Sequence, residues 1–301
     1  MYDLIILGSG PAGLTAAVYA IRKRLNVLVI APDMGGKANM HMYLPEHLER
    51  FQVITGDEIV SRFKSQIEYL NYAYRNEVAD QVQVIQGGYQ VWTTDGGKFE
   101  TKALLVATGS QGIPLNVPGE TEYRMHGLGY SAISYAPLFI DRIVAVVGEG
   151  ELGDRSALEL GQCAQKVYYI VPSGKSEENP LTKKVHQASN VSILDGYKVK
   201  EIKGDGNYVR SIVVLRDGDE KDLEVDVTFV EMGLVPNSGC VSGFVRLNDK
   251  KQIMVDSRNR TSAPGIFAAG DVTDTFAEQV LICIGEGAKA ALSAYEYILS
   301  L

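Results

Sequence analysis

Asp3-Leu-Ile-Ile-Leu7, followed by Gly8-Ser-Gly10-Pro-Ala-Gly13, is the stretch that decides the fold. It reads as a short apolar strand, a GxGxxG turn and the start of a helix, which is the order of a dinucleotide-binding unit. The first glycine allows the tight turn, the second lets the backbone approach a pyrophosphate, and the third lets the helix pack on the strand. The helix then presents free N–H groups to the phosphate, so we expect a dinucleotide here rather than a plain strand–turn–helix.

A second unit of the same kind begins at Arg142-Ile-Val-Ala-Val-Val147 and continues into Gly148-Glu-Gly150-Glu-Leu-Gly153. Its glycines can still admit a pyrophosphate, but Glu149 and Glu151 flank the turn with negative charge. Two such units in one chain predict two dinucleotide sites and therefore electron transfer. The alternative is that the second unit is only an element of the fold.

Composition narrows the class of protein. The chain has 301 residues, enough for two domains, and a net charge of −8, which argues against nucleic-acid binding. No apolar run reaches the roughly 18 residues of a membrane span. Three cysteines, Cys163, Cys240 and Cys283, are too few for a disulfide scaffold, and the histidines lack metal-ligand spacing. We expect a cytoplasmic protein without a metal and without an integral membrane segment.

The order of elements predicts an α/β fold with two Rossmann-like, three-layer nucleotide-binding domains. Glycine- and proline-rich linkers at 109–119 and 233–239 separate them. We predict a discontinuous FAD-type domain at 1–111 and 242–301, with a nucleotide-binding domain inserted at 112–241. Helical spacing predicts helices over 56–75 and 279–299, and a short strand is expected over 252–255.

Two carboxylates are candidates for cofactor contacts. The usual ribose-binding position at the end of the second strand is Ala31, and Asp33 either replaces it or only opens the turn into Gly35-Gly36. Gly270-Asp271 follows an apolar strand and precedes a helix. A carboxylate there can accept bonds from a ribityl chain or help to orient a flavin phosphate, whereas its structural alternative is a turn or N-cap aspartate.

The chain resembles a low-molecular-weight thioredoxin reductase, within the pyridine-nucleotide-linked flavoproteins. Matching segments run through the whole chain in the family's order: Gly8-Ser-Gly-Pro-Ala-Gly13, Gly35-Gly36-Lys37, Leu105-Val-Ala-Thr-Gly109, Gly129-Tyr-Ser-Ala132, Val146-Val-Gly-Glu-Gly150, Gly233-Leu-Val-Pro-Asn237, Gly265-Ile-Phe-Ala-Ala-Gly-Asp271 and 279–291. The resemblance implies a homodimer with FAD in the discontinuous domain. The implied FAD contacts are Gly8, Gly10, Pro11, Ala12, Gly13, Asp33, Gly35, Gly36, Lys37, Thr108, Gly109, Gly270, Asp271, Gln279 and Val280. The implied second nucleotide site contains Gly148, Gly150, Gly153 and Tyr135.

The first departure from the family concerns the redox-active Cys-x-x-Cys. Ile133-Ser-Tyr-Ala136 stands in its place, and Pro137 stands where the family has an acid. Thiol exchange needs a thiolate and a leaving sulfur, so the chain cannot act as an ordinary thioredoxin reductase by that route. A Cys240–Cys283 pair is a weak substitute, and the catalytic residues are otherwise unassigned.

The second departure concerns NADPH. The family holds the 2′-phosphate with an Arg pair, but Val171-Pro-Ser173 follows the relevant strand here, and the nearest cation is Lys175. This argues against NADPH at the usual site.

The leading hypothesis is an FAD-dependent oxidoreductase on the thioredoxin reductase fold that uses neither the usual dithiol nor the usual NADPH site. A second FAD in the nucleotide site would match the diflavin-linked disulfide oxidoreductases of photosynthetic bacteria. One alternative is a ferredoxin- or flavodoxin-type NAD(P)H reductase, with a small redox protein as partner. The other alternative is a non-catalytic FAD-binding sensor or partner protein.

Overall fold

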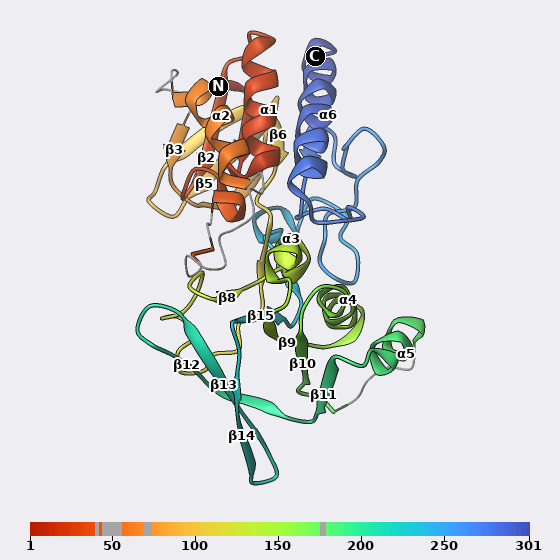
Figure 1. Cartoon of the computed structure of the whole chain (residues 1–301). Helices are drawn as coiled ribbons and strands as arrows, with labels where there is room; N and C mark the ends of the chain where they lie inside the picture. The colour runs from red at the N-terminus through yellow and green to blue at the C-terminus, as the bar shows by residue number, and fades with distance from the viewer. Residues whose placement is uncertain (40–41, 44–55, 69–73, 175–178) are drawn as a thin grey trace. The chain divides into compact units, whose positions relative to one another are not determined.

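The computed structural model describes residues 1–39, 42–43, 56–68, 74–174 and 179–301 (Figure 1). The chain divides into two compact units, the first made of residues 1–41, 54–111 and 235–301 and the second of residues 42–53 and 112–234. The return to the first unit thus comes after Leu234, earlier than the predicted boundary at 241/242. The reason is that Val241 and Val245 are buried in a core cluster of the first unit.

The first unit is built on a seven-stranded sheet in the order β3-β2-β1-β6-β5-β4, with β17 also paired to β6. The strands are β1 Tyr2–Leu7, β2 Val27–Ala31, β3 Tyr74–Asn76, β4 Ala79–Ile85, β5 Gly88–Thr93, β6 Lys98–Val106 and β17 Ile266–Ala268. β1 is parallel to both β2 and β6, with Leu4 opposite Val27 and Ala103. The central strands therefore all end at the same edge, where the glycine turn begins.

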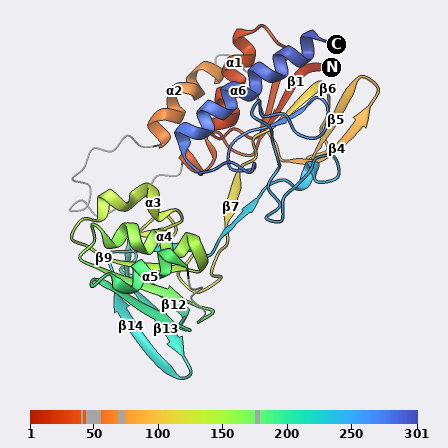
Figure 2. The same ribbon diagram turned by 90° about the vertical axis from the view of Figure 1, so that its right-hand side faces the viewer.

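Helices α1 (Pro11–Arg22), α2 (Gly56–Glu68) and α6 (Val280–Leu299) belong to this unit. α1 and α6 lie side by side, as both views show (Figure 2). A Cβ on Gly287 of α6 would lie 2.1 Å from the carbonyl oxygen of Ala12, so the two backbones are in direct contact. Their apolar faces and the alternate side chains of the sheet form one core.

Two expected elements of the first unit are wrong in extent. The helix predicted over 56–75 ends at Glu68, residues 69–73 lie outside the described residues, and Tyr74–Asn76 is strand β3, paired with β2. The strand predicted over 252–255 is reduced to isolated bridges at Ile253. In both places tertiary pairing, rather than local periodicity, sets the conformation.

The second unit contains a parallel sheet in the order β11-β10-β9-β15-β8. Its strands are β8 Leu128–Gly129, β9 Ile143–Gly148, β10 Lys166–Val171, β11 Val191–Asp195 and β15 Val227–Glu231. Its helices are α3 Ala132–Tyr135, α4 Gly150–Gly161 and α5 Pro180–Gln187, and the 3-10 turn η3, Ala136–Phe139, follows α3. The sheet has the first unit's plan of a glycine turn between its central strand and the next helix.

An antiparallel sheet, β12-β13-β14, extends the second unit, with β12 Lys198–Gly204, β13 Val209–Arg216 and β14 Asp219–Glu224. β12, β14 and α5 were not expected, because β14 reads Asp-Glu-Lys-Asp-Leu-Glu and carries almost no apolar alternation. A short two-stranded ribbon, β7 (Ser110–Gly112) with β16 (Leu234–Pro236), pairs the two segments where the chain passes between units.

Candidate functional site

The glycine turn of the first unit separates packing from access. Gly8 has φ +101°, and a Cβ there would lie 2.2 Å from the Ala107 carbonyl oxygen. A Cβ on Gly13 would lie 2.0 Å from the Gly8 carbonyl oxygen, so helix and strand can meet only without a side chain. Gly10 differs, because no described atom lies within 4 Å of its Cβ position. The backbone at Gly10 is therefore open to a ligand.

Helix α1 begins directly at this open backbone. Gly10 is its N-cap, Pro11 occupies the first turn where an N–H is not needed, and the Leu14 N–H donates to the Gly10 carbonyl at 2.9 Å. Gly36 lies beside it, since a Cβ there would be 3.3 Å from the Gly10 Cα. A helix N-terminus with bare backbone on two adjoining loops fits the pyrophosphate of a dinucleotide.

Asp33 has a turn-forming role. It follows β2, and its Oδ1 accepts a hydrogen bond from the Gly36 N–H at 2.9 Å. The Ser9 hydroxyl donates to the Asp33 carbonyl, which ties this loop to the glycine turn. Asp33 thus shapes the Gly35-Gly36 turn, and a contact between its exposed carboxylate and a ribose remains a prediction.

Lys37 joins predicted site residues that are far apart in the sequence. Its Nζ lies 2.8 Å from Asp271 Oδ2 and donates to Ser110 Oγ at 2.9 Å. Glu278 Oε2 is a longer contact at 3.7 Å. The Asp271 side chain is only 13% exposed, against 44% for Lys37. The Gly270-Asp271 corner is therefore held beside the Gly35–Lys37 loop by a partly buried ion pair.

The start of α6 completes this edge. Gly270 has φ +78°, and its N–H donates to Glu286 Oε2 at 2.8 Å. The other oxygen of Glu286 accepts a hydrogen bond from Thr275 at 2.8 Å. Gln279 is the N-cap of α6, and Val280 is its first residue. Sequence reasoning missed Glu286, because a glutamate inside a helix gives no signal that it orients a loop preceding that helix.

Thr108 and Gly109 are held by the returning chain. The Thr108 hydroxyl donates to the Asn237 carbonyl at 2.7 Å, and Asn237 Nδ2 donates to the Thr108 carbonyl at 2.9 Å. The Asn237 N–H also donates to the Gly109 carbonyl at 2.9 Å. These reciprocal bonds fix the loop after β6, which lies next to the turn after β1 because β6 and β1 are paired.

The two candidate thiols do not meet. Cys283 belongs to the core on the helix-covered face of the first sheet, whereas Cys240 packs against the core on its other face. Burial and then the Asp271 carboxylate, 3.2 Å from the Cys283 thiol, raise the pKa of Cys283. Burial raises the pKa of Cys240 to about 11. Both thiols are therefore protonated near neutral pH, where thiol exchange needs a thiolate.

The segment in the place of Cys-x-x-Cys forms α3 and the start of η3. Tyr135 stacks on Phe229 with ring centroids 6.4 Å apart, so its ring is part of the packing of the second unit. The Ala132 N–H donates to Glu231 Oε1 at 2.5 Å. Glu231 is only 4% exposed, and burial raises its pKa. Sequence reasoning missed this carboxyl group, which ends an otherwise apolar strand.

The second glycine turn keeps the packing roles of the first. A Cβ on Gly148 would lie 2.8 Å from the Glu231 carbonyl oxygen, and one on Gly153 would lie 2.7 Å from the Tyr169 hydroxyl. Gly150 has φ +61° and, within the described part of the chain, no atom within 4 Å of its Cβ position. The backbone at Gly150 is therefore open to a ligand as well.

A buried carboxylate lies behind this turn. Asp154, 3% exposed, accepts hydrogen bonds from the hydroxyls of Tyr169 (3.0 Å) and Thr182 (2.6 Å) and from Asn179 Nδ2 (3.2 Å). Asn179 also caps α5 by accepting from the Leu181 and Thr182 N–H groups. The network joins α4, β10 and α5, and it fixes the walls of the turn.

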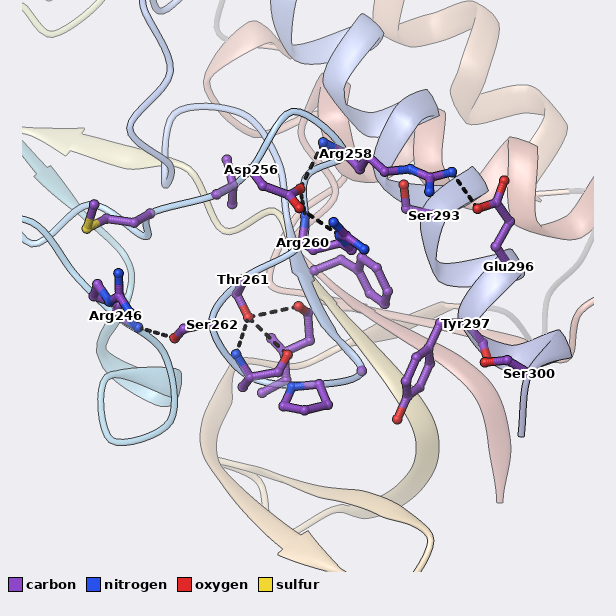
Figure 3. Close-up of a pocket in the computed structure, with 17 residues that line it drawn as sticks. Arg246, Asp256, Arg258, Arg260, Thr261, Ser262, Ser293, Glu296, Tyr297 and Ser300 are labelled. Carbon is purple, nitrogen blue, oxygen red and sulfur yellow. Dashed lines mark hydrogen bonds and ion pairs between the residues drawn. The ribbon is translucent and has the colours of Figure 1, made fainter.

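The largest cavity found, about 740 Å³, lies elsewhere in the first unit (Figure 3). It is lined by the residues that lead into β17 and by the last turns of α6, at the opposite edge of the sheet from the glycine turn. Two of its arginines are paired, Arg258 with Glu296 at 2.5 Å and Arg260 with Asp256 at 2.7 Å. It is therefore not the dinucleotide site.

Two further searches cover the described residues. They contain no group of three or more His, Cys, Asp and Glu side chains placed to hold a metal ion. Nor does this part of the chain include a helix with the length and apolar character of a membrane span. Lys175, the cation nearest to β10 in sequence, lies outside the described residues.

Residues 2–290 match the family described as Pyridine nucleotide-disulphide oxidoreductase. One relative, a component of the alkyl hydroperoxide reductase of Pseudomonas aeruginosa, is 33% identical over 305 residues, which are 99% of this chain and 58% of that protein. The Staphylococcus aureus protein of the same name is also 33% identical, over 99% of this chain and 59% of its own length. The chain thus spans somewhat more than half the length of these curated relatives.

Solved structures agree with this match. Thioredoxin reductase from Streptococcus pyogenes superposes with a TM-score of 0.89 at 30% identity, over 100% of this chain and 99% of that chain. Thioredoxin reductase from Giardia duodenalis gives a TM-score of 0.87 at 27% identity, with the same coverage. The predicted fold of two Rossmann-like units is confirmed. The chain belongs to the pyridine nucleotide-disulphide oxidoreductase family, as a thioredoxin reductase-like, flavin-dependent oxidoreductase.

Proposed function

We propose that this flavoenzyme holds one FAD at the carboxyl edge of the first sheet and moves electrons without an active-site dithiol. When bound, the FAD supplies the redox chemistry, and the protein binds and orients it. The open backbone at Gly10 and the N-terminus of α1 would hold its pyrophosphate, and Asp271 would accept hydroxyl groups of the ribityl chain. Lys37 would neutralise the negative charge that accumulates there.

One contrast supports the proposal most strongly. The first unit keeps the glycine turn, the Lys37–Asp271 pair and the α6 N-terminus together, whereas the thiols are protonated and separated. Residues 133–136 carry no sulfur at all. A dithiol relay is therefore not available within the chain at the usual place, and electrons pass between the flavin and an external partner.

We propose further that the second unit binds a dinucleotide other than NADPH, either NADH or a second FAD, and that the enzyme works as a homodimer. The open backbone at Gly150 supports a pyrophosphate there. The electron acceptor would be a small redox protein or a small molecule. Reduction of alkyl hydroperoxides, suggested by the names of the relatives, would need such a partner, because the chain spans only part of those proteins.

Flavin counting on the purified protein tests the proposal. The absorbance of released FAD, divided by chain concentration, gives flavins per chain, and anaerobic mixing with NADH, NADPH and a chemically reduced ferredoxin identifies the donor. We expect at least one FAD per chain, reduced by a donor other than NADPH. One flavin reduced by NADH indicates a reductase with NADH in the second site, and two flavins indicate the diflavin arrangement. A colourless protein that stays empty with excess FAD contradicts the proposal, and a flavin that no donor reduces indicates the sensor alternative.

A further inference from the structure

A second cavity, about 510 Å³, opens at the carboxyl edge of the second unit's parallel sheet. We call it the ribose-end pocket, and its lining is Glu149, Pro172, Ser173, Gly174, Asp195, Gly196, Lys198, Arg216 and Asp217. Glu149 follows β9, Pro172 follows β10, and Asp195 ends β11. Ligands of doubly wound sheets bind at these strand ends, and the glycine turn after β9 is part of the same edge. The ribose-end pocket therefore lies where the adenosine half of a dinucleotide would lie.

The floor of the pocket is preformed backbone. Gly174 and Gly196 have φ +64° and +75°, and a Cβ on Gly174 would lie 3.3 Å from the Gly196 Cα. The N–H groups of Gly196 and Gly174 both donate to the Val171 carbonyl, at 2.8 and 3.1 Å. The loops after β10 and β11 are thus held together, so the pocket needs no rearrangement to exist.

The charges around the pocket are mixed, with three carboxylates against two cations. Arg216 is already engaged, because its Nη1 donates to the Asp195 carbonyl at 2.8 Å and its Nε lies 3.6 Å from Asp217 Oδ2. A guanidinium that spends one arm on a backbone carbonyl cannot offer its full fork to a phosphate.

The base of the pocket lies in a negative field. The Tyr169 hydroxyl donates to the buried Asp154, and its pKa is raised by burial, then by Asp154, and further by Glu149 and Asp195. Glu149 and Asp195 therefore act on the same atoms as Asp154, although they lie after different strands. A dianionic 2′-phosphate placed between them would be repelled, whereas a ribose hydroxyl could donate to either carboxylate.

We propose that the ribose-end pocket binds an adenosine ribose with a free 2′-hydroxyl and excludes one with a 2′-phosphate, and that Glu149 and Asp195 determine this choice. The inference rests on the proposed function in one respect, that the second unit binds a dinucleotide. It adds the chemical class, which includes NADH, FAD and ADP-ribose and leaves out NADPH. Sequence reasoning found the missing Arg pair but could not show that carboxylates from other strand ends fill its surroundings.

Calorimetric titration of the FAD-loaded protein with ADP-ribose and with 2′-phospho-ADP-ribose tests the proposal. We expect ADP-ribose to bind about tenfold more tightly or better. Glu149→Gln and Asp195→Asn, which remove charge and keep shape, should each narrow the ratio about threefold. Glu220→Gln is the matched control, because Glu220 lies in an exposed ion pair with Lys200 on the β12–β14 sheet. Protein that purifies with two flavins is assayed by displacement of the second flavin by the same two probes.

Three results would overturn the inference. They are tighter binding of the 2′-phosphate form, a ratio that Glu149→Gln and Asp195→Asn leave unchanged, and absence of binding by both probes. A 2′-phosphate preference that Arg216→Gln abolishes would show instead that Arg216 replaces the missing Arg pair. These outcomes are separate from the failure of the proposed function, since FAD retention in the first unit is read from the visible absorbance of the same samples.

Discussion

The two glycine turns of this protein have similar backbones and different surroundings. In both, the first and third glycines are required by packing, and the middle glycine is open. The first turn is bordered by the Lys37–Asp271 pair and by two helix N-termini. The second is bordered by Glu149, Asp195 and the buried Asp154. A GxGxxG motif thus records what the backbone must do, while side chains brought from other elements determine which ligand is accepted.

The largest effect should come from closing the first turn. Gly10→Val places a side chain where the structure leaves room and where φ is −67°, so folding should persist while the pyrophosphate is blocked. We expect FAD affinity to fall by about 100-fold or more, since a filled cradle removes several charge-assisted hydrogen bonds. Flavin content after gel filtration, with circular dichroism as the folding check, measures the change.

The matched change at the second turn is Gly150→Val. It should leave the flavin of the first unit in place, although the left-handed φ of Gly150 costs some stability. If Gly150→Val releases all of the flavin and Gly10→Val releases none, the assignment of the two turns is reversed.

The buried network behind the second turn should give the next largest effect. Asp154→Ala leaves the Tyr169 and Thr182 hydroxyls without their shared acceptor, so we expect a loss of about 2 kcal/mol in the free energy of unfolding. Thermal unfolding, followed by the signal of the second unit, measures it. Glu151→Ala is the control, because Glu151 is 71% exposed in its pair with Arg155 and should change stability by less than about 0.5 kcal/mol. Equal losses in both variants would mean that the network does not hold this turn.

A smaller, pH-dependent effect should come from Glu231. Its pKa is raised in the folded protein, so the neutral form is favoured there and stability falls as pH rises through the folded-state pKa. Glu231→Gln keeps an acceptor for the Ala132 N–H and removes the titration. Melting temperatures of the two proteins should diverge as pH increases above the ordinary value of 4.5, by the equivalent of about 1 kcal/mol in favour of the variant. Parallel curves would show that Glu231 is not desolvated.

The smallest effect is expected from the thiols. Replacing Cys163, Cys240 and Cys283 together with serine should leave the rate of flavin reoxidation within about twofold, because no protonated, separated thiol takes part in electron transfer. Stopped-flow spectra of wild type and variant give the comparison. A loss of reoxidation in the variant, with flavin still bound, would restore a sulfur-based route.

Much of the first unit could be predicted from the sequence because its signals are local. A strand, a glycine turn and a helix lie within the first 22 residues, and the register of the sheet follows from their apolar runs. The pairing of Lys37 with Asp271 could not be predicted, since it joins residues at opposite ends of the chain. Glu231, Glu286 and Arg216 were missed for the same physical reason: burial or a distant backbone partner gives each of them its role, and neither leaves a periodic signal.

The contact between Gly287 and Ala12 has a consequence for biosynthesis. α6 supplies Cys283, Ala290, Ala291 and Ala294 to the core that also contains α1, and it follows the whole second unit in the chain. On a ribosome, the inserted unit therefore leaves the exit tunnel while the amino-terminal strands still wait for their last helix. The flavin cradle is completed only when residues 280–299 dock, so cofactor capture is a late, nearly post-translational step.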